Sequence, residues 1–479
     1  MIASRCMIAV MFLASGPLLS AAGDPKDSKA SKQSPFSCVS PPVLPYPPPT
    51  VPADTISPRQ EDFDCFSWKE FIALNWQADP ASPGNPNPTA KPAQFGMRND
   101  TSPVVWETYK DVDDVFQTDA APPAVWGAPL GPKKLSSYLQ AGSHAWLTTQ
   151  SKHFTFYEIR LNEDEFNYIV NNRLYDAAIQ RTFAQSKGIT LPDGSDKSAS
   201  YGKVGAIEIK AAWIPLDDQR DWPRYKTSKA LVTDPSSKKQ QEVVVGLVGL
   251  HIIHKTQFAQ QFAWATFEHV DNAPSIADLE HPESLKKRYT YYNPKCDPAS
   301  DPYKCEPNHN PNPSGHDPTP PVSTAPIQVV RENPIATKSS NNIVALNQQV
   351  WATIAAQNPK SVFLNYQLVN VQWPTDNHAL TGPTRIPLTE GNPAPTPGHV
   401  TNTTLETYFQ TTLSCLDCHS NASVSSHAGP GAPTRAVLDF ALNPNGKMIL
   451  KPQPPASTQP FATDYSFVFE RAVTGPTPK

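Results

Sequence analysis

Five consecutive residues near the end of the chain, Cys-Leu-Asp-Cys-His at positions 415–419, have the types and the spacing that haem attachment requires. Two thiols three residues apart lie about one helical turn from each other, so each can add to a vinyl group of the same haem. The histidine that follows is then placed to bind the iron. The motif therefore predicts one covalent haem c, with Cys415 and Cys418 as the points of attachment and His419 as an iron ligand.

Two other kinds of site use a cysteine pair at this spacing, namely a redox dithiol and one half of a zinc centre. A zinc centre needs two further ligands nearby, and the nearest histidines, His399 and His427, lie in expected loops without a second cysteine pair. A redox dithiol belongs to the strand-to-helix turn of a βαβ unit, and this sequence does not alternate strand and helix in that way. The context favours haem attachment.

The motif does not fix the ligand on the opposite face of the iron, which can be methionine, histidine or no protein group. Met448 is the only methionine downstream of the motif, and we take it as a tentative sixth ligand; the alternative is that it fills the core. His251 and His254 are three apart on an expected strand, so they should point to opposite faces and have structural roles. A structural role is also expected for His269.

The chain that positions the motif is expected to consist mainly of strands. Segments 204–214, 243–254 and 261–270 are rich in β-branched and aromatic residues at or near period two and are separated by polar turns. They predict a twisted antiparallel sheet, and a further buried strand is expected over 362–373. We therefore expect an α+β fold, a β-rich domain with flanking helices and many proline-rich loops.

Apolar residues at helical spacing predict the flanking helices. One begins near Cys65, one runs from a cap at Asn162 to Gly188, and one runs from Ile343 to a stop at Asn358-Pro359. A fourth is expected to lead into the motif, with Thr403 and Glu406 as its capping box and an apolar stripe up to Leu413. Because the motif comes late, the haem should be built into the β-rich domain rather than into a small helical module.

The composition limits the possible partners. The net charge is −4, from 40 basic and 44 acidic residues, so there is no basic excess and nucleic acid is not an expected partner. The 54 prolines are about twice the usual share, which favours loops and turns over a helical bundle. We find no internal repeat, so a single haem is expected.

The first 22 residues predict export. Residues 1–22 contain Arg5, then an apolar run over 7–19, then the small residues Ser-Ala-Ala, which together are typical of a signal peptide. A periplasmic or otherwise exported, soluble protein without a membrane span is expected, because no later stretch has the length of a membrane helix. Residues 23–62 are rich in lysine, serine and proline and predict an arm or spacer, whereas 63–479 should form a single large haem-bearing domain.

Four cysteines remain outside the signal peptide and the haem motif. An even number in an exported protein predicts two disulfides, and the local pairing joins Cys38 to Cys65 and Cys296 to Cys305. The alternative for the second pair is a zinc site. Such a site would also use His309 and His316.

Four segments, in chain order, are similar to those of the small β-rich monohaem family that includes the hydroxylamine-oxidising cytochromes and the beta-type cytochromes c-prime. They are Gly-Ala-Ile-Glu-Ile-Lys at 205–210, Trp-Ala-Thr-Phe-Glu at 264–268, the haem motif, and Asp-Tyr-Ser-Phe at 464–467. The resemblance covers about a third of the chain, and the long insertions depart from the family pattern. It implies an iron without a protein ligand on its distal side.

The resemblance also implies a role for Lys210, which corresponds to a strand lysine that bonds to the haem edge in the hydroxylamine-oxidising members. On the strand, Ile207, Ile209 and Ala211 share one face, and Glu208 and Lys210 share the other. The ordinary interpretation of such a Glu and Lys is a solvated ion pair. Lys210 is therefore a tentative cofactor-binding residue.

These observations favour an exported monohaem c-type cytochrome that binds haem and transfers electrons to or from a redox partner protein. The chain is several times larger than an electron carrier needs to be. The alternative is a haem enzyme or ligand-binding protein, acting on a small nitrogen or oxygen species at an open distal haem site; as an enzyme it would be a haem-dependent oxidoreductase. A third possibility is a subunit of a larger respiratory complex, tethered by the proline-rich arm.

Overall fold

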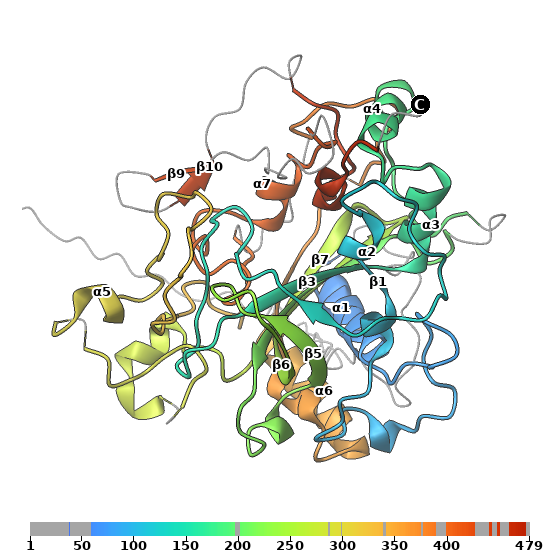
Figure 1. The fold of residues 1–479 in the computed structure, drawn as a ribbon. Coiled ribbons are helices and arrows are strands. Elements are labelled where there is room, and N and C mark those ends of the chain that lie inside the picture. The colour runs from blue at the N-terminus through green and yellow to red at the C-terminus, as the bar shows by residue number, and fades with distance from the viewer. Residues whose placement is uncertain are drawn as a thin grey trace, which may run out of the picture. The chain divides into compact units, whose positions relative to one another are not determined.

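The computed structural model describes residues 38, 59–196, 202–285, 288–297, 299–338, 342–374, 377–388, 399–426, 440–442, 448–450 and 459–475. The expected signal peptide and nearly all of the expected arm lie outside these residues. The described part has the α+β, β-rich architecture that the sequence predicts, with an eight-stranded sheet flanked by helices (Figure 1). Among the described residues, no helix combines the length and the apolar character that crossing a membrane requires.

The sheet is curled around one long central strand. The strands run in the order β1-β3-β4-β6-β5-β2, and β7 pairs with both β6 and β8; all pairs are antiparallel except β2 with β5. Strand β6 pairs with β4 along one edge and with β5 and then β7 along the other. The strands are β1 (Lys110–Asp111), β2 (Lys134–Leu135), β3 (Phe156–Leu161), β4 (Ile207–Pro215), β5 (Thr227–Thr233), β6 (Gln240–Thr256), β7 (Ala259–His269) and β8 (Tyr366–Gln372).

The three segments predicted as strands form β4, β6 and β7, the centre of this sheet. The fourth is only partly a strand, because Val362–Asn365 forms a 3-10 helix before β8 begins at Tyr366. Outside the large sheet, β9 (Phe440–Leu442) and β10 (Met448–Leu450) form a separate antiparallel pair.

Two helices cover the apolar face of the sheet, α1 (Gln60–Leu74) and α6 (Ile343–Gln357). The Trp68 ring of α1 meets Phe267 of β7 edge-on at 5.0 Å between centroids, and its indole nitrogen donates to Asn347 of α6 at 2.9 Å. The sequence predicted both helices because their buried residues recur at helical spacing. Figure 1 shows them on the side of β7 away from the haem-motif helix α7 (Cys415–His419).

The predicted helix from Asn162 to Gly188 is interrupted. It divides into α3 (Glu163–Asn171) and α4 (Ala177–Ser186), separated by Arg173, whose φ of 55° is left-handed. The cap at Asn162 is as predicted, and a second cap at Asp176 starts the new helix. Gly188 ends α4 with a φ of 78°, a conformation that glycine adopts without strain.

The helix predicted over Thr403 to Leu413 is wrong, because this segment is a series of turns and only α7 is helical. Side chains compete with the helical backbone here: Asn402 accepts hydrogen bonds from the amide and hydroxyl of Thr404, and the Thr407 hydroxyl donates to the Thr403 carbonyl. Such local bonds favour turns over helix. Glu406 accepts from the amide of Asn402 rather than from Thr403, so the predicted capping box is also wrong.

Both predicted disulfides are present. Cys38 bonds to Cys65 on α1 and Cys296 bonds to Cys305, each with a Cα to Cα distance of 5.3 Å. The second disulfide excludes the alternative zinc site, and His309 contacts Glu306 instead. The remaining short elements are α2 (Val112–Val115), α5 (Pro302–Cys305) and 3-10 helices at Pro92–Gln94, Val105–Thr108, Trp222–Arg224, Ile276–Glu280, Pro282–Ser284 and Phe467–Arg471.

Candidate haem-attachment site

The motif helix α7 is short but is fixed at both its start and its side. The Ser414 hydroxyl accepts from the Asp417 amide at 3.4 Å, and the Asp417 carboxylate accepts from the Ser414 amide at 2.7 Å. Leu416 is fully buried, and its amide donates to the side chain of Gln372 on β8 at 3.0 Å. These contacts hold the half-buried Cys415 and Cys418 one turn apart, and the two sulfurs are not joined by a disulfide.

The His419 ring is oriented by three contacts. Its Nδ1 is 2.8 Å from the carbonyl oxygen of Tyr465, and a carbonyl can only accept, so Nδ1 carries the proton. The ring also contacts Trp264 of β7, at 4.4 Å between centroids, and Phe467, at 4.9 Å. This arrangement leaves the lone pair of Nε2 for a metal, as expected of a ligating histidine whose other nitrogen is engaged.

The pKa values of His419 and Cys415 favour a neutral imidazole ligand and argue against a reactive dithiol. Burial lowers the pKa of His419 to about 4, so its imidazole is neutral at pH 7 and able to bind iron. Burial, followed by the charge of Glu406, raises the pKa of the Cys415 thiol well above its usual value. In redox-active dithiol proteins the pKa of the reactive thiol is instead lowered. The raised pKa of Cys415 therefore does not fit a redox dithiol.

The haem motif faces a polar row of side chains across the centre of the sheet. Lys210 of β4 is the register partner of His251 of β6, which in turn is opposite Thr266 of β7. Glu406 joins this row from above: its two carboxylate oxygens are 3.4 Å from Lys210 Nζ and 3.3 Å from His251 Nε2. Although burial opposes it, the neighbouring His251 and Lys210 lower the pKa of Glu406 to about 2, so this carboxylate is ionised.

The Lys210–Glu406–His251 cluster lies close enough to the motif to influence it. Lys210 and His251 both contribute to lowering the pKa of His419, and Glu406 acts on His419 and on Cys415. The sequence made Lys210 a tentative cofactor-binding residue, with a solvated ion pair to Glu208 as the alternative. The structure pairs Lys210 with Glu406, and Glu208 is buried, so that alternative is wrong.

His251 and His254 point to opposite faces, as predicted. His254 bonds to Glu70 of α1, which fits its expected structural role, and His269 bonds to the Arg224 carbonyl. His251 lies on the opposite face and its Nε2 is 3.3 Å from Glu406, so its expected structural role stays a prediction. Glu406 was taken only as a helix cap, and nothing local to its sequence indicated that it would reach a strand of the sheet.

A buried ion pair anchors the turns that carry Glu406. Glu268 of β7 bonds to both terminal nitrogens of Arg331, at 3.1 and 2.5 Å, and accepts from the amide and hydroxyl of Thr403, both at 2.7 Å. Nearby, Gly249 of β6 makes room for the same turns, since a Cβ there would lie 2.2 Å from the Thr404 hydroxyl oxygen. The segment that follows therefore approaches the motif from a fixed starting point.

The structure thus brings together the four segments that resemble the β-rich monohaem family. Trp264 and Phe467 contact the motif histidine, Tyr465 accepts its hydrogen bond, and Lys210 lies within electrostatic range. For Met448 only the backbone is described, at the start of β10, so its prediction as sixth ligand is not tested. His427 lies outside the described residues.

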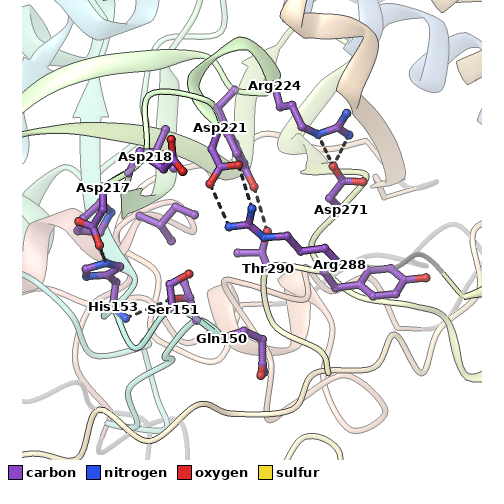
Figure 2. Close-up of a pocket in the computed structure, with 16 residues that line it drawn as sticks. Gln150, Ser151, His153, Asp217, Asp218, Asp221, Arg224, Asp271, Arg288 and Thr290 are labelled. Atoms are coloured by element: carbon purple, nitrogen blue, oxygen red, sulfur yellow. Dashed lines mark hydrogen bonds and ion pairs between the residues drawn. The ribbon is translucent and has the colours of Figure 1, made fainter. Parts of the chain in front are cut away.

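A cavity of about 670 Å³ lies elsewhere, beyond the end of β4 (Figure 2). The charged side chains that line it are paired with one another or with a neighbour. Figure 2 shows ion pairs between Asp217 and His153, between Asp221 and Arg288, and between Arg224 and Asp271. The fourth acid, Asp218, forms an ion pair with Arg220. Because these charges are compensated, the cavity offers little to select a charged ligand, and we assign it no role.

Comparison of the chain with protein-family models, with curated protein sequences and with solved structures gives no match. Among the described residues, no group of three or more His, Cys, Asp or Glu side chains is arranged to hold a metal ion. The donor set at the motif nevertheless suits haem c, which requires two thiols on one helical turn and one imidazole with a free Nε2. The functional interpretation therefore depends on this geometry.

Proposed function

We propose that the chain is an exported monohaem c-type cytochrome whose function is electron transfer. The observation that carries the proposal is the oriented His419, which follows two cysteines on one helical turn and turns its Nδ1 to the Tyr465 carbonyl. Cys415 and Cys418 would hold one haem through thioethers, and His419 Nε2 would bind the iron. The haem supplies the one-electron chemistry when it is bound.

The residues around His419 orient its ring for binding iron. The hydrogen bond from His419 to Tyr465 fixes the ring and increases its basicity as a ligand. Packing of Trp264 and Phe467 against the His419 ring supports the same orientation. Covalent attachment holds a haem even where its edge is open to solvent, which suits exchange of electrons with a redox partner protein.

Export is supported by the two disulfides, because such bonds persist in oxidising compartments. The periplasm is the compartment that we propose, on the basis of the expected signal peptide and the location of haem c attachment. We likewise propose that Lys210 is a cofactor-binding residue at the haem edge, supported by the position of Lys210 beside the motif.

A second candidate function is supported by the Lys210–Glu406–His251 cluster. This cluster places an amine, a carboxylate and an imidazole next to the motif, the kinds of group that an enzyme acting on a small nitrogen or oxygen species at an open distal haem site would use. The absorption spectrum with and without carbon monoxide separates the two functions. A low-spin spectrum that ignores carbon monoxide supports electron transfer, and a high-spin ferric form that binds it on reduction supports the enzyme.

The decisive experiment is production of the protein with and without the c-type haem maturation machinery, followed by mass spectrometry under denaturing conditions. We expect one haem per chain, lost in Cys415→Ser with Cys418→Ser. A matched control is the second cysteine pair, since Cys296→Ser with Cys305→Ser should retain the haem. Protein without added haem mass from a host with working maturation would contradict the proposal.

A further inference from the structure

Three carboxyl groups and one lysine are buried together close to the haem motif. Glu165 of α3 and Asp464 are fully buried, Glu208 of β4 is 5% exposed, and Lys255 of β6 is fully buried. Buried charges are stable only when they are compensated or neutralised by a proton. With all four groups charged, the cluster of three acids and one base would carry a net charge of −2, and two bound protons would make it neutral.

Asp464 is the acid that is compensated as an ion. Its Oδ2 binds Lys255 Nζ and also accepts from the Leu191 amide at 2.7 Å. The cation and the amide both contact Oδ2, so this oxygen carries a compensated negative charge. Lys255 therefore forms its ion pair with Asp464 and not with Glu165 or Glu208.

Glu165 and Glu208 therefore have each other as neighbours. Three oxygens of this pair have no hydrogen-bond donor among the described residues. They are both carboxyl oxygens of Glu165 and Oε1 of Glu208. The two carboxyls adjoin, and burial raises the pKa of Glu165 well above its usual value and that of Glu208 to about 7. Two adjoining buried carboxyls cannot both be ionised, so near neutral pH they share a proton.

This carboxyl pair is connected to the iron ligand through two short paths. Ser466 lies beside Glu208 and directly follows Tyr465, whose carbonyl oxygen accepts the hydrogen bond from His419 Nδ1. In addition, Glu208 is two residues from Lys210 on the same face of β4, next to the motif. A change of charge at the haem would therefore change the proton affinity of the pair, because electrostatic interactions are stronger in a buried region of low dielectric.

We infer that the Glu165–Glu208 pair takes up one proton when the haem held by His419 is reduced and releases it when the haem is oxidised. The inference rests on the proposed function. A haem held here would gain one electron from the redox partner on reduction, and the site would lose one positive charge. A proton from solvent then binds the ionised carboxylate of the pair, so the net charge of the buried region is unchanged.

The other charged groups around the pair are held by partners of their own and are poor candidates for this proton. Asp164 of α3 accepts from three backbone amides, those of Gly202, Val204 and Gly205. The remaining groups also have partners. Ion pairs or hydrogen bonds join Asp464 to Lys255, His254 to Glu70 and Lys210 to Glu406, and Asp193 accepts from Gln260 and from the Ser195 amide.

The test is a spectroelectrochemical titration of the haem-loaded protein between pH 5 and 9. Unmodified protein should show a reduction potential that falls as the pH rises through about 7, toward the ~59 mV per tenfold change in proton concentration that one proton per electron gives. Glu165→Gln and Glu208→Gln should each flatten this dependence. The control Glu406→Gln should move the potential by a similar amount at every pH but keep the slope, because Glu406 is ionised throughout this range.

A second measurement does not depend on the variants. In the reduced-minus-oxidised infrared spectrum at pH 7, unmodified protein should gain the carbonyl band of a protonated carboxyl group. A potential independent of pH, or a slope that persists in folded Glu165→Gln and Glu208→Gln, overturns the inference while haem attachment stands. Failure of the chain to take up haem would instead overturn the proposed function, and this inference with it.

Discussion

Replacing Glu268 with alanine should destabilise the protein strongly and loosen the haem motif. The side chain is fully buried, and it bonds to Arg331, which is 5% exposed, and to the amide and hydroxyl of Thr403. Removing one partner of a buried ion pair leaves an uncompensated charge, which costs about 3–5 kcal/mol. The two donors of Thr403 lose their acceptor as well, so the upper part of this range is expected.

The assay is urea unfolding followed by far-ultraviolet circular dichroism. With a slope of about 3 kcal/mol per molar urea, a loss of about 3–5 kcal/mol should lower the midpoint by about 1–1.7 M. A matched control is Asp218→Ala, which removes an exposed partner of Arg220 and should leave the midpoint nearly unchanged.

A double variant tests the reasoning itself. Arg331→Met combined with Glu268→Ala removes both charges and should cost clearly less than the sum of the two single changes, because neither leaves a buried charge behind. Additive losses would show that Glu268 and Arg331 are not energetically coupled. A loss below about 1 kcal/mol for Glu268→Ala alone would refute the role given to the network.

Three further outcomes are expected. The stability advantage of unmodified protein over Glu208→Gln, measured by urea midpoints, should be present below about pH 4.5 and be lost as the pH rises through about 7, because the folded state holds a proton that the unfolded Glu208 has released. Breaking the Cys38–Cys65 disulfide should cost about 3.5 kcal/mol of unfolding free energy against about 2.5 for Cys296–Cys305, since the loops span 27 and 9 residues; equal losses would contradict this. Met448→Ala should alter the absorption spectrum of the haem-loaded protein only if its sulfur binds the iron, and an unchanged spectrum would exclude Met448 as the sixth ligand.

Local signals in the sequence predicted the central strands, helices α1 and α6 and both disulfides. Each of these depends on a periodic pattern or on nearby cysteines, which a single sequence displays directly. The helix predicted before the motif failed for a related reason: its apolar stripe is present, but Asn402 and its threonine neighbours use their side chains to form turns.

The site was predicted less completely, because its parts are far apart in the chain. The motif itself is contiguous and was recognised from the sequence alone. The acceptor for His419 is 46 residues further on, and the partner that Glu406 finds on β4 is 196 residues away. Contacts at such separations arise from strand register and turn geometry, which residue types alone do not specify.

The distance between His419 and Tyr465 has a consequence for biogenesis. If the chain is exported and loaded with haem as we propose, its two cysteines leave the secretion channel well before the segment that orients the histidine. The enzyme that attaches the haem would then meet the motif before His419 is fixed. Docking of the segment around Tyr465 would follow and fix the histidine, so the order of synthesis would separate haem attachment from closure of the site.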